Sequence, residues 1–222
     1  RFRIANSYIQ LLSAVRYLYQ MPYRQLEGYT KALHRLVPEL PEADYSGIRK
    51  RIQRLQVNPY EHLSESSDPV AIALDSTGVK VEKAGGWVER KHGKKKRYVK
   101  LHFAVRVDTH EVVSMEVSTD DVHDSKEAAG LLEGACSRAD VEEALFDGAY
   151  DSEEVYGELE KRKIEAVVKP RRNARSDTGP LSRSVAGGMI RELGYESWAE
   201  TVGYGMLWAV ETDYSTFKRL FG

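Results

Sequence analysis

Ala-Leu-Phe-Asp-Gly-Ala-Tyr-Asp-Ser, at residues 144–152, carries the clearest structural signal in the chain. A short apolar run that ends on a carboxylate and a glycine is typical of a buried strand that delivers an acid to an active site. The same pattern occurs once before, at residues 70–78, which read Val-Ala-Ile-Ala-Leu-Asp-Ser-Thr-Gly. We interpret Asp75 and Asp147 as acids at the ends of two neighbouring strands, an arrangement that calls for a third ligand and a metal ion.

The elements around these two strands predict a mixed α/β sheet. Extended patterns occur at residues 70–74, 98–107, 111–117, 144–146 and 166–168, and helical patterns at 125–136, 152–163 and 180–221. We expect a turn at Gly78 and a hairpin turn at residues 108–110. Hairpin strands followed by alternating strands and helices predict a ribonuclease H-like sheet, with antiparallel strands at one edge, parallel strands after them, and flanking helices.

Residues 1–58 predict a small all-helical domain. Apolar residues recur at helical spacing over residues 4–20, 23–37 and 44–55, with prolines between them. The last helix has a basic face formed by Arg49, Lys50, Arg51 and Arg54. This order resembles a helix-turn-helix unit, so we predict a DNA-binding region, with a solvated basic face as the alternative. Residues 59–69 predict a linker to a catalytic domain over residues 70–222.

The charge of the chain is unevenly distributed. Residues 1–60 hold ten Lys and Arg against four Asp and Glu, a net +6, and the whole chain carries −1, so residues 61–222 carry −7. Basic charge in a helical module suits a polyanion such as DNA, and clustered acids suit divalent metal ions. Solvated charged faces are the alternative interpretation for both.

The sequence indicates an intracellular setting without a membrane. It has no run of eighteen apolar residues and no secretion signal, so we expect no membrane partner. A lone cysteine, Cys136, excludes an internal disulfide and favours a cytoplasmic, nucleoid-associated protein. The chain begins at Arg1 and ends eleven residues after Glu211, which favours a fragment of a longer protein.

Glu211 is the candidate for the third acid. Tyr204, Glu211 and Lys218 are seven residues apart, and on one helix each such step falls about 20° short of two turns, so the three would share one stripe. On spacing alone, a solvated stripe with an aromatic against the core is the simpler interpretation. Three adjacent carboxylates raise one another's pKa and would be stabilised by Mg²⁺ or Mn²⁺. Two such ions about 3.5–4 Å apart activate phosphodiester cleavage.

Four motifs carry a resemblance to a known family. They are Leu-Asp-Ser-Thr-Gly at 74–78, Asp-Gly-Ala-Tyr-Asp-Ser at 147–152, Lys-Pro-Arg-Arg-Asn at 169–173 and Glu-Thr-Asp-Tyr-Ser-Thr-Phe-Lys-Arg-Leu-Phe-Gly at 211–222. The chain resembles DDE transposases encoded by bacterial and archaeal insertion sequences, from roughly residue 20 to its end. The resemblance implies that the catalytic and metal-binding triad is Asp75, Asp147 and Glu211, on a ribonuclease H-like fold.

The resemblance also implies contacts with double-stranded DNA, namely terminal inverted repeats and target DNA, by a homodimer or larger assembly. Tyr204 and Lys218 match the family's tyrosine, arginine, glutamate, lysine signature, in which Leu207 takes the arginine position. Two basic clusters are predicted to contact the phosphate backbone, with solvated loops as the alternative. They consist of Lys94, Lys95 and Lys96 in one loop and Arg171 and Arg172 in another.

Several other polar residues lie near the proposed ligands. We interpret Asp151 as the N-cap of the helix that follows it. His123, Asp124 and Ser125 could offer a ligand or a base, but we favour Asp124 or Ser125 as the cap of the helix over residues 125–136. Asp213, two residues after Glu211, should point away from it.

Together these features predict a DNA transposase that cleaves the ends of its element and joins the 3′-hydroxyl to target DNA by two-metal chemistry. Two alternatives stay open. One is a ribonuclease H-like nuclease that cuts without strand transfer. The other is a catalytically inactive or domesticated DNA-binding remnant, which Leu207 would fit.

Overall fold

The computed structural model describes residues 4–64, 68–80, 98–171 and 180–221 of the 222-residue chain. Contacts within the chain define two compact units, residues 1–61 and residues 62–220. Each unit has its own hydrophobic core. Within the described ranges, no helix is both long enough and apolar enough to span a bilayer.

The described part of the first unit contains three helices, α1 (Asn6–Leu18), α2 (Tyr23–Leu36) and α3 (Tyr45–Ile52). Their common core consists of Tyr8, Ile9, Leu12, Leu26, Ala43 and Ile48. The Asp44 carboxylate caps α3, because it accepts the backbone N–H groups of Ser46 at 3.0 Å and Gly47 at 2.9 Å. The three helices predicted from the sequence are therefore present.

The second unit is built on a five-stranded mixed sheet in the order β3-β2-β1-β4-β5. The strands are β1 (Val70–Lys80), β2 (Tyr98–Arg106), β3 (Val112–Thr119), β4 (Val141–Phe146) and β5 (Glu165–Val168). β2 lies antiparallel to both β1 and β3, whereas β4 runs parallel to β1 and β5 parallel to β4. This topology confirms the predicted ribonuclease H-like fold.

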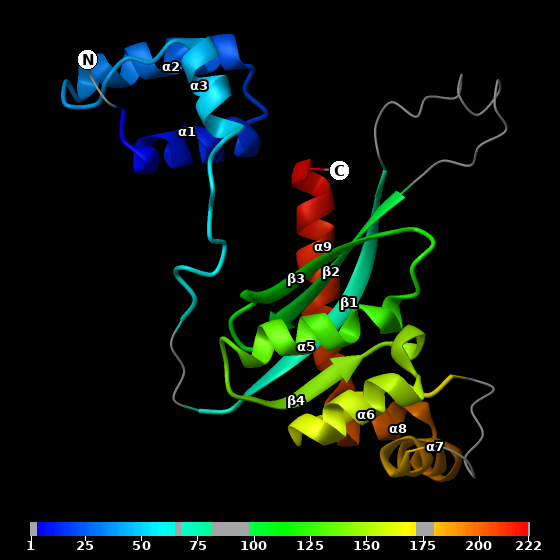
Figure 1. Ribbon diagram of the computed structural model, residues 1–222. Helices are drawn as coiled ribbons and strands as arrows, with labels where there is room; N and C mark the ends of the chain where they lie inside the picture. The colour runs from blue at the N-terminus through cyan, green and yellow to red at the C-terminus, as the bar shows by residue number, and fades with distance from the viewer. Residues whose placement is uncertain (1–3, 65–67, 81–97, 172–179, 222) are drawn as a thin grey trace, which may run out of the picture. The chain divides into compact units, whose positions relative to one another are not determined.

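Helices cover both faces of the sheet (Figure 1). α5 (Ala128–Cys136) and α6 (Glu153–Arg162) lie on one face, and α7 (Leu181–Leu193), α8 (Tyr195–Thr201) and α9 (Trp208–Phe221) pack on the other. Leu74 and Phe146 belong to the first core, whereas Ala73 and Leu145 belong to the second. This division follows from the alternation of side chains along a strand.

The structure corrects the predicted extent of β1. The turn expected at Gly78 is absent, because β1 continues through Gly78 and pairs with β2 as far as Lys80. The parallel register with β4 ends earlier, where Leu74 lies opposite Phe146. Asp75 therefore lies at the point where β1 separates from β4 and continues along β2.

Trp198→Ala should destabilise the second unit by about 3–5 kcal/mol, because a large core side chain is removed and a cavity remains. Trp198 is 1% exposed and packs between α8 and the sheet. Trp208→Ala is the matched control, since Trp208 is 57% exposed and its loss should cost less than about 1 kcal/mol. Urea unfolding monitored by circular dichroism measures both changes, and equal losses would contradict this assignment of the core.

Candidate active site

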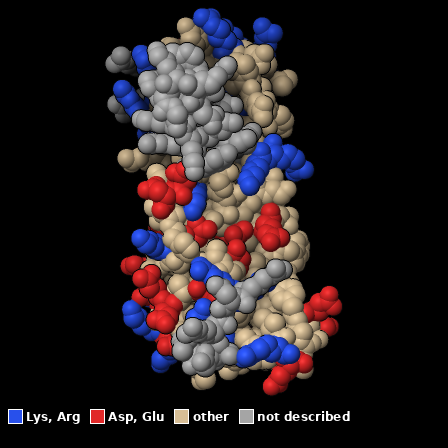
Figure 2. Space-filling model, turned by 90° about the vertical axis from the view of Figure 1, so that its right-hand side faces the viewer, with Lys and Arg blue, Asp and Glu red and all other residues tan. Residues whose placement is uncertain are grey.

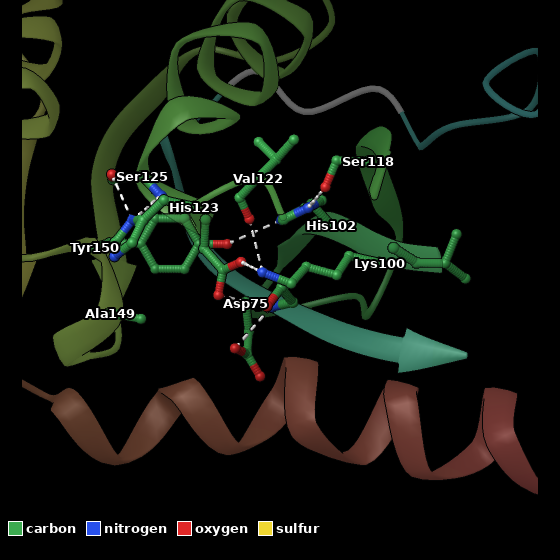
Figure 3. A network of polar contacts seen from close by, with 12 residues as sticks. Asp75, Lys100, His102, Ser118, Val122, His123, Ser125, Ala149 and Tyr150 are labelled. Carbon is green, nitrogen blue, oxygen red and sulfur yellow. Dashed lines mark hydrogen bonds and ion pairs between the residues drawn. The ribbon is translucent and has the colours of Figure 1, made fainter. Parts of the chain in front are cut away.

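Asp75 and Asp147 directly follow the last parallel pair of β1 and β4, Leu74 and Phe146. The Asp75 carboxylate accepts the backbone N–H of Ser76 at 2.7 Å and points toward α9 (Figure 3). The Asp147 carboxylate accepts the N–H of Ala149 at 2.8 Å and caps the short 3-10 helix η2 (Gly148–Tyr150). Two adjacent strands thus deliver one acid each to the same edge of the sheet.

Both aspartates hold their protons more tightly than an ordinary aspartate. Burial, followed by the nearby charges of Asp147, Glu211 and Asp124, raises the pKa of Asp75 to about 7. Burial also raises the pKa of Asp147, to which the charge of Asp124 contributes. On the face shown in Figure 2, acidic side chains gather with Lys and Arg among them. The site is therefore a concentration of negative charge that a cation would stabilise.

Glu211 lies in the first turn of α9 and is exposed. It shares a pocket of about 540 Å³ with Asp147. The other residues that line this pocket are Gly148, Ala149, Lys169, Pro170, Arg171, Tyr195, Tyr204, Gly205, Leu207 and Trp208. The structure therefore places Glu211 and Asp147 at the same pocket.

The three acids do not form a preformed metal cage. Within the described ranges, no three His, Cys, Asp or Glu side chains are grouped closely enough to hold a metal ion. The carboxylates nevertheless influence one another electrostatically, because both Asp147 and Glu211 raise the pKa of Asp75. Their oxygen atoms are hard donors of the kind that Mg²⁺ and Mn²⁺ prefer, so the donor chemistry fits a divalent ion.

Asp124 is a fourth acid at this site, and the sequence analysis missed its role. Its carboxylate accepts the Ser76 hydroxyl at 2.8 Å and pairs with Lys100 at 2.9 Å, while Lys100 also donates to the carbonyl oxygen of Val122 (Figure 3). Although burial acts in the opposite direction, these bonds from Lys100 and Ser76 hold the pKa of Asp124 below its usual range. The predicted cap role is wrong, because His123 caps the 3-10 helix η1 (Asp124–Lys126).

A buried histidine and tyrosine lie beneath this network. His102 on β2 is fully buried, and its ring nitrogens lie 2.7 Å from the Ser118 hydroxyl and 3.5 Å from the Tyr150 hydroxyl. Burial lowers the pKa of His102 and raises that of Tyr150. Both groups are therefore neutral near pH 7, and they add no charge to the acid cluster.

The loop after Asp147 is fixed by Asp151. The Asp151 carboxylate is buried, pairs with Arg183 of α7 at 2.8 Å and accepts the backbone N–H of Arg171 at 2.9 Å. The predicted cap role of Asp151 is wrong, because Ser152 accepts the N–H of Val155 and caps α6. A buried ion pair thus ties this loop to α7 and to the segment after β5.

Arg171 itself strengthens this attachment. Its guanidinium donates to the carbonyl oxygens of Gly148 at 2.9 Å and Ala149 at 3.0 Å. These bonds hold the residues that directly follow Asp147. Arg172 and Lys94–Lys96, the other members of the two predicted basic clusters, lie outside the described residues.

The single helix expected over Tyr204, Glu211 and Lys218 is interrupted. Tyr204 to Leu207 form a 3-10 turn, η3, and α9 begins at Trp208. Tyr204 still lies near the acids, because it lines the same pocket as Asp147 and Glu211. Burial, followed by nearby charges, raises its pKa. Leu207 is buried in the second core, and Lys218 is exposed on α9.

Asp213 faces a different neighbour from the acid cluster. Its carboxylate lies 3.4 Å from Nδ1 of His110, in the turn between β2 and β3. Burial raises the pKa of Asp213, and the hydrogen bond from His110 opposes that shift. Its contact agrees with the prediction that it points away from Glu211.

The basic face of α3 is only partly free. Arg49 and Lys50 are exposed on α3. Arg54 is also exposed, but the prediction that it lies on this helix is wrong, because α3 ends at Ile52 and Arg54 lies in the turn that follows. Arg51 instead donates to the carbonyl oxygen of Ile4 and, at 2.6 Å, to the side-chain oxygen of Asn6. Its guanidinium therefore fastens the residues at the start of α1, a role that the charge pattern alone did not reveal.

The sheet topology and the acids at its edge define a ribonuclease H-like domain. Two family models match the chain, both described as transposase DDE domain, one over residues 66–222 and the other over residues 2–84. The chain therefore belongs to the transposase DDE domain family, which confirms the resemblance. Among solved structures, the catalytic core domain of BIV integrase is 12% identical over 63% of this chain and 79% of its own, with a TM-score of 0.31.

Asp75→Asn should make the protein in EDTA more stable than the wild type at pH 8 and equally stable near pH 3. The pKa of Asp75 rises on folding from 3.8 to about 7. Between these two pH values, the folded state retains a proton that the unfolded state releases. The wild type therefore loses stability as the pH rises from 3.8 to about 7. The gain from the substitution should reach a few kcal/mol, at about 1.4 kcal/mol for each tenfold change in proton affinity.

Urea unfolding from pH 3 to pH 9 measures this difference. Asp120→Asn serves as the control because Asp120 is exposed, and its stability should track the wild type at every pH. If the free energies of unfolding of Asp75→Asn and wild type changed with pH in parallel, the rise in the pKa of Asp75 on folding would be contradicted.

Proposed function

We propose that this chain is a metal-dependent DNA transposase in which Asp75, Asp147 and Glu211 are the catalytic and metal-binding residues. The observation that carries the proposal is the shared electrostatics of the three acids, since both other carboxylates raise the pKa of Asp75. An acid whose pKa is raised by burial and by neighbouring carboxylates is characteristic of a functional site. Membership of the transposase DDE domain family supports the same assignment.

The residues present fit divalent metal ions, Mg²⁺ or Mn²⁺, of which we propose two. Asp75 and Asp147 would hold the ions from the sheet, and Glu211 from the first turn of α9. Bound ions would supply Lewis-acid chemistry, which activates the attacking oxygen and stabilises the leaving oxygen of a phosphodiester. Mg²⁺ keeps several water ligands, so a few carboxylates are enough to bind it.

The protein's own part is to position the acids and the DNA. The attachments made by Asp151 and Arg171 hold the loop after Asp147, and Ser76 and Asp124 lie beside Asp75. Tyr204 lines the pocket beside the acids, and we propose that it and Lys218 contact the DNA end. Hydrolysis at the element end would free a 3′-hydroxyl, which would then attack target DNA at the same site without a covalent protein intermediate.

Binding to double-stranded DNA is proposed to involve the first unit as well. Arg49 and Lys50 on α3, with Arg54 in the turn that follows it, form an exposed basic surface. Lysines 94–96 and Arg172 remain proposed phosphate contacts, and Arg171 adds positive charge to the pocket. We propose that the chain acts at the nucleoid as a homodimer or larger assembly on terminal inverted repeats and target DNA.

One observation favours a second candidate, a DNA-binding remnant without catalysis. Leu207 occupies the arginine position of the family signature, and its side chain is buried in the apolar core on that face of the sheet. An expected cation is therefore missing from the signature. Metal-dependent cleavage by the wild type separates this candidate from the transposase.

Asp147→Asn should reduce Mg²⁺-dependent cleavage of terminal-repeat DNA by about 10³-fold or more, because several kcal/mol of transition-state stabilisation are lost. Binding of the same DNA in EDTA, followed by gel shift, should persist. Glu142→Gln, an exposed carboxylate on the same strand, is the control and should cut normally. A folded, DNA-binding Asp147→Asn protein that still cuts in Mg²⁺ would refute the proposal.

Replacing Arg49, Lys50 and Arg54 together by Gln should weaken binding of the duplex and flatten its salt dependence. Each lost phosphate contact should reduce the slope of log K against log salt by about 0.9, or by nearly 3 for three contacts. Arg24, Lys31 and Arg35 of α2, replaced by Gln, make a control with the same change in charge. Equal slopes for the two triple variants would exclude a specific role for α3.

A further inference from the structure

The hydroxyl of Tyr214 connects α9 to the backbone of the residue that carries the first candidate acid. It accepts the backbone N–H of Phe103 at 2.9 Å and donates to the carbonyl oxygen of Asp75. Asp75 and Phe103 are register partners on β1 and β2. The carbonyl oxygen of Leu101 lies 3.2 Å away as a further acceptor. The hydroxyl therefore bridges two strands at Asp75 itself.

The ring of Tyr214 is buried and packed against aromatic side chains. Tyr214 is 4% exposed and stacks on Phe103, with ring centroids 4.9 Å apart and planes at 23°. Phe217, one turn further along α9, packs edge-on against the same Phe103 ring at 5.9 Å. A tyrosine fixed by stacking and by bonds to two strands leaves α9 little freedom to slide or rotate on the sheet.

This attachment also determines where Glu211 lies. Glu211 precedes Tyr214 by three residues, which places it about 4.5 Å away along the helix axis and about 60° around it. Asp75 thus has its carbonyl oxygen bonded to α9 while its carboxylate points toward the same helix (Figure 3). The Tyr214 hydrogen bond therefore links the helix that carries Glu211 directly to the backbone of Asp75.

We propose that Tyr214 is a positioning residue that sets the relative placement of Glu211 and Asp75 for metal binding and DNA cleavage. The inference rests on the proposed function, because it assigns both acids to the metal site. Tyr214 touches neither substrate nor metal in this role. It acts through the rotation and depth of α9, and its hydroxyl is the group that matters.

Tyr214→Phe, which removes only that hydroxyl, tests the inference. The control is Tyr156→Phe, because Tyr156 is 1% exposed and its hydroxyl has no hydrogen-bond partner among the described residues. In Tyr214→Phe we expect Mn²⁺ affinity, measured by electron paramagnetic resonance without DNA, and kcat for cleavage to fall by about 10- to 100-fold, as for other residues that orient metal ligands. KM for DNA should not change, and hydrogen exchange should quicken over residues 208–214.

The Tyr156→Phe protein should match the wild type in all of these measurements. If Tyr214→Phe bound Mn²⁺ and cleaved DNA with the affinity and kcat of the wild type, the inference would be overturned. This holds even if hydrogen exchange in α9 were faster, because the Tyr214 hydrogen bond would then contribute to stability alone. Failure of the proposed function gives a different result. In that case the wild type and Glu211→Gln would show the same Mn²⁺ affinity and the same absence of cleavage. That result would overturn both the proposed function and the positioning role of Tyr214.

Discussion

The parallel pairing of β1 with β4 is the constraint on which the site depends. Leu74 and Phe146 are buried on one face of the sheet, and Ala73 and Leu145 are buried on the other. A slip of one residue in this register would move each of these side chains to the opposite core, so packing on both faces fixes the pairing. The same pairing fixes the positions of Asp75 and Asp147, because each follows directly after a member of the last pair, Leu74 and Phe146.

The acids of this unit differ in how their charge is balanced. Asp124 is paired with Lys100, and Asp151 with Arg183, so these two carboxylates have structural roles with a cation at hydrogen-bond distance. The Asp75 carboxylate receives only the N–H of Ser76 among the hydrogen bonds of the described residues, and burial raises its pKa. The fold thus neutralises the acids that hold the loops and leaves the acid at the strand edge available for a cation.

The sequence predicts what depends on local pattern. The apolar runs before Asp75 and Asp147 identified two strands, and the order of elements identified the sheet, because strands and helices differ in periodicity. The turn at Gly78 was expected from glycine alone, whereas pairing with β2 carries β1 onward to Lys80. The break between Tyr204 and Trp208 was missed because a seven-residue spacing does not distinguish one helix from a 3-10 turn followed by another.

What the sequence could not predict are the partners of individual polar groups. Lys100 and Arg51 look like free cations along the chain, yet each is bonded to residues that only the tertiary fold brings near. Asp151 lies 32 residues from Arg183, and Tyr214 lies 139 residues from Asp75. Such pairs leave no periodic signal in one sequence. They determine how rigidly the acids are held, which the residue types alone do not reveal.

Leu207 is best understood from its surroundings in the pocket. Its side chain completes the apolar core under η3 and α9, so this position contributes packing instead of charge. The same pocket is lined by Lys169 and Arg171 from the segment after β5, and the charge of Lys169 acts to lower the pKa of Asp147 against the larger effect of burial. The carbonyl oxygens bonded to Arg171 do not cancel its positive charge. Cations therefore reach this pocket from another element, and for this reason we place the transposase ahead of the inactive remnant.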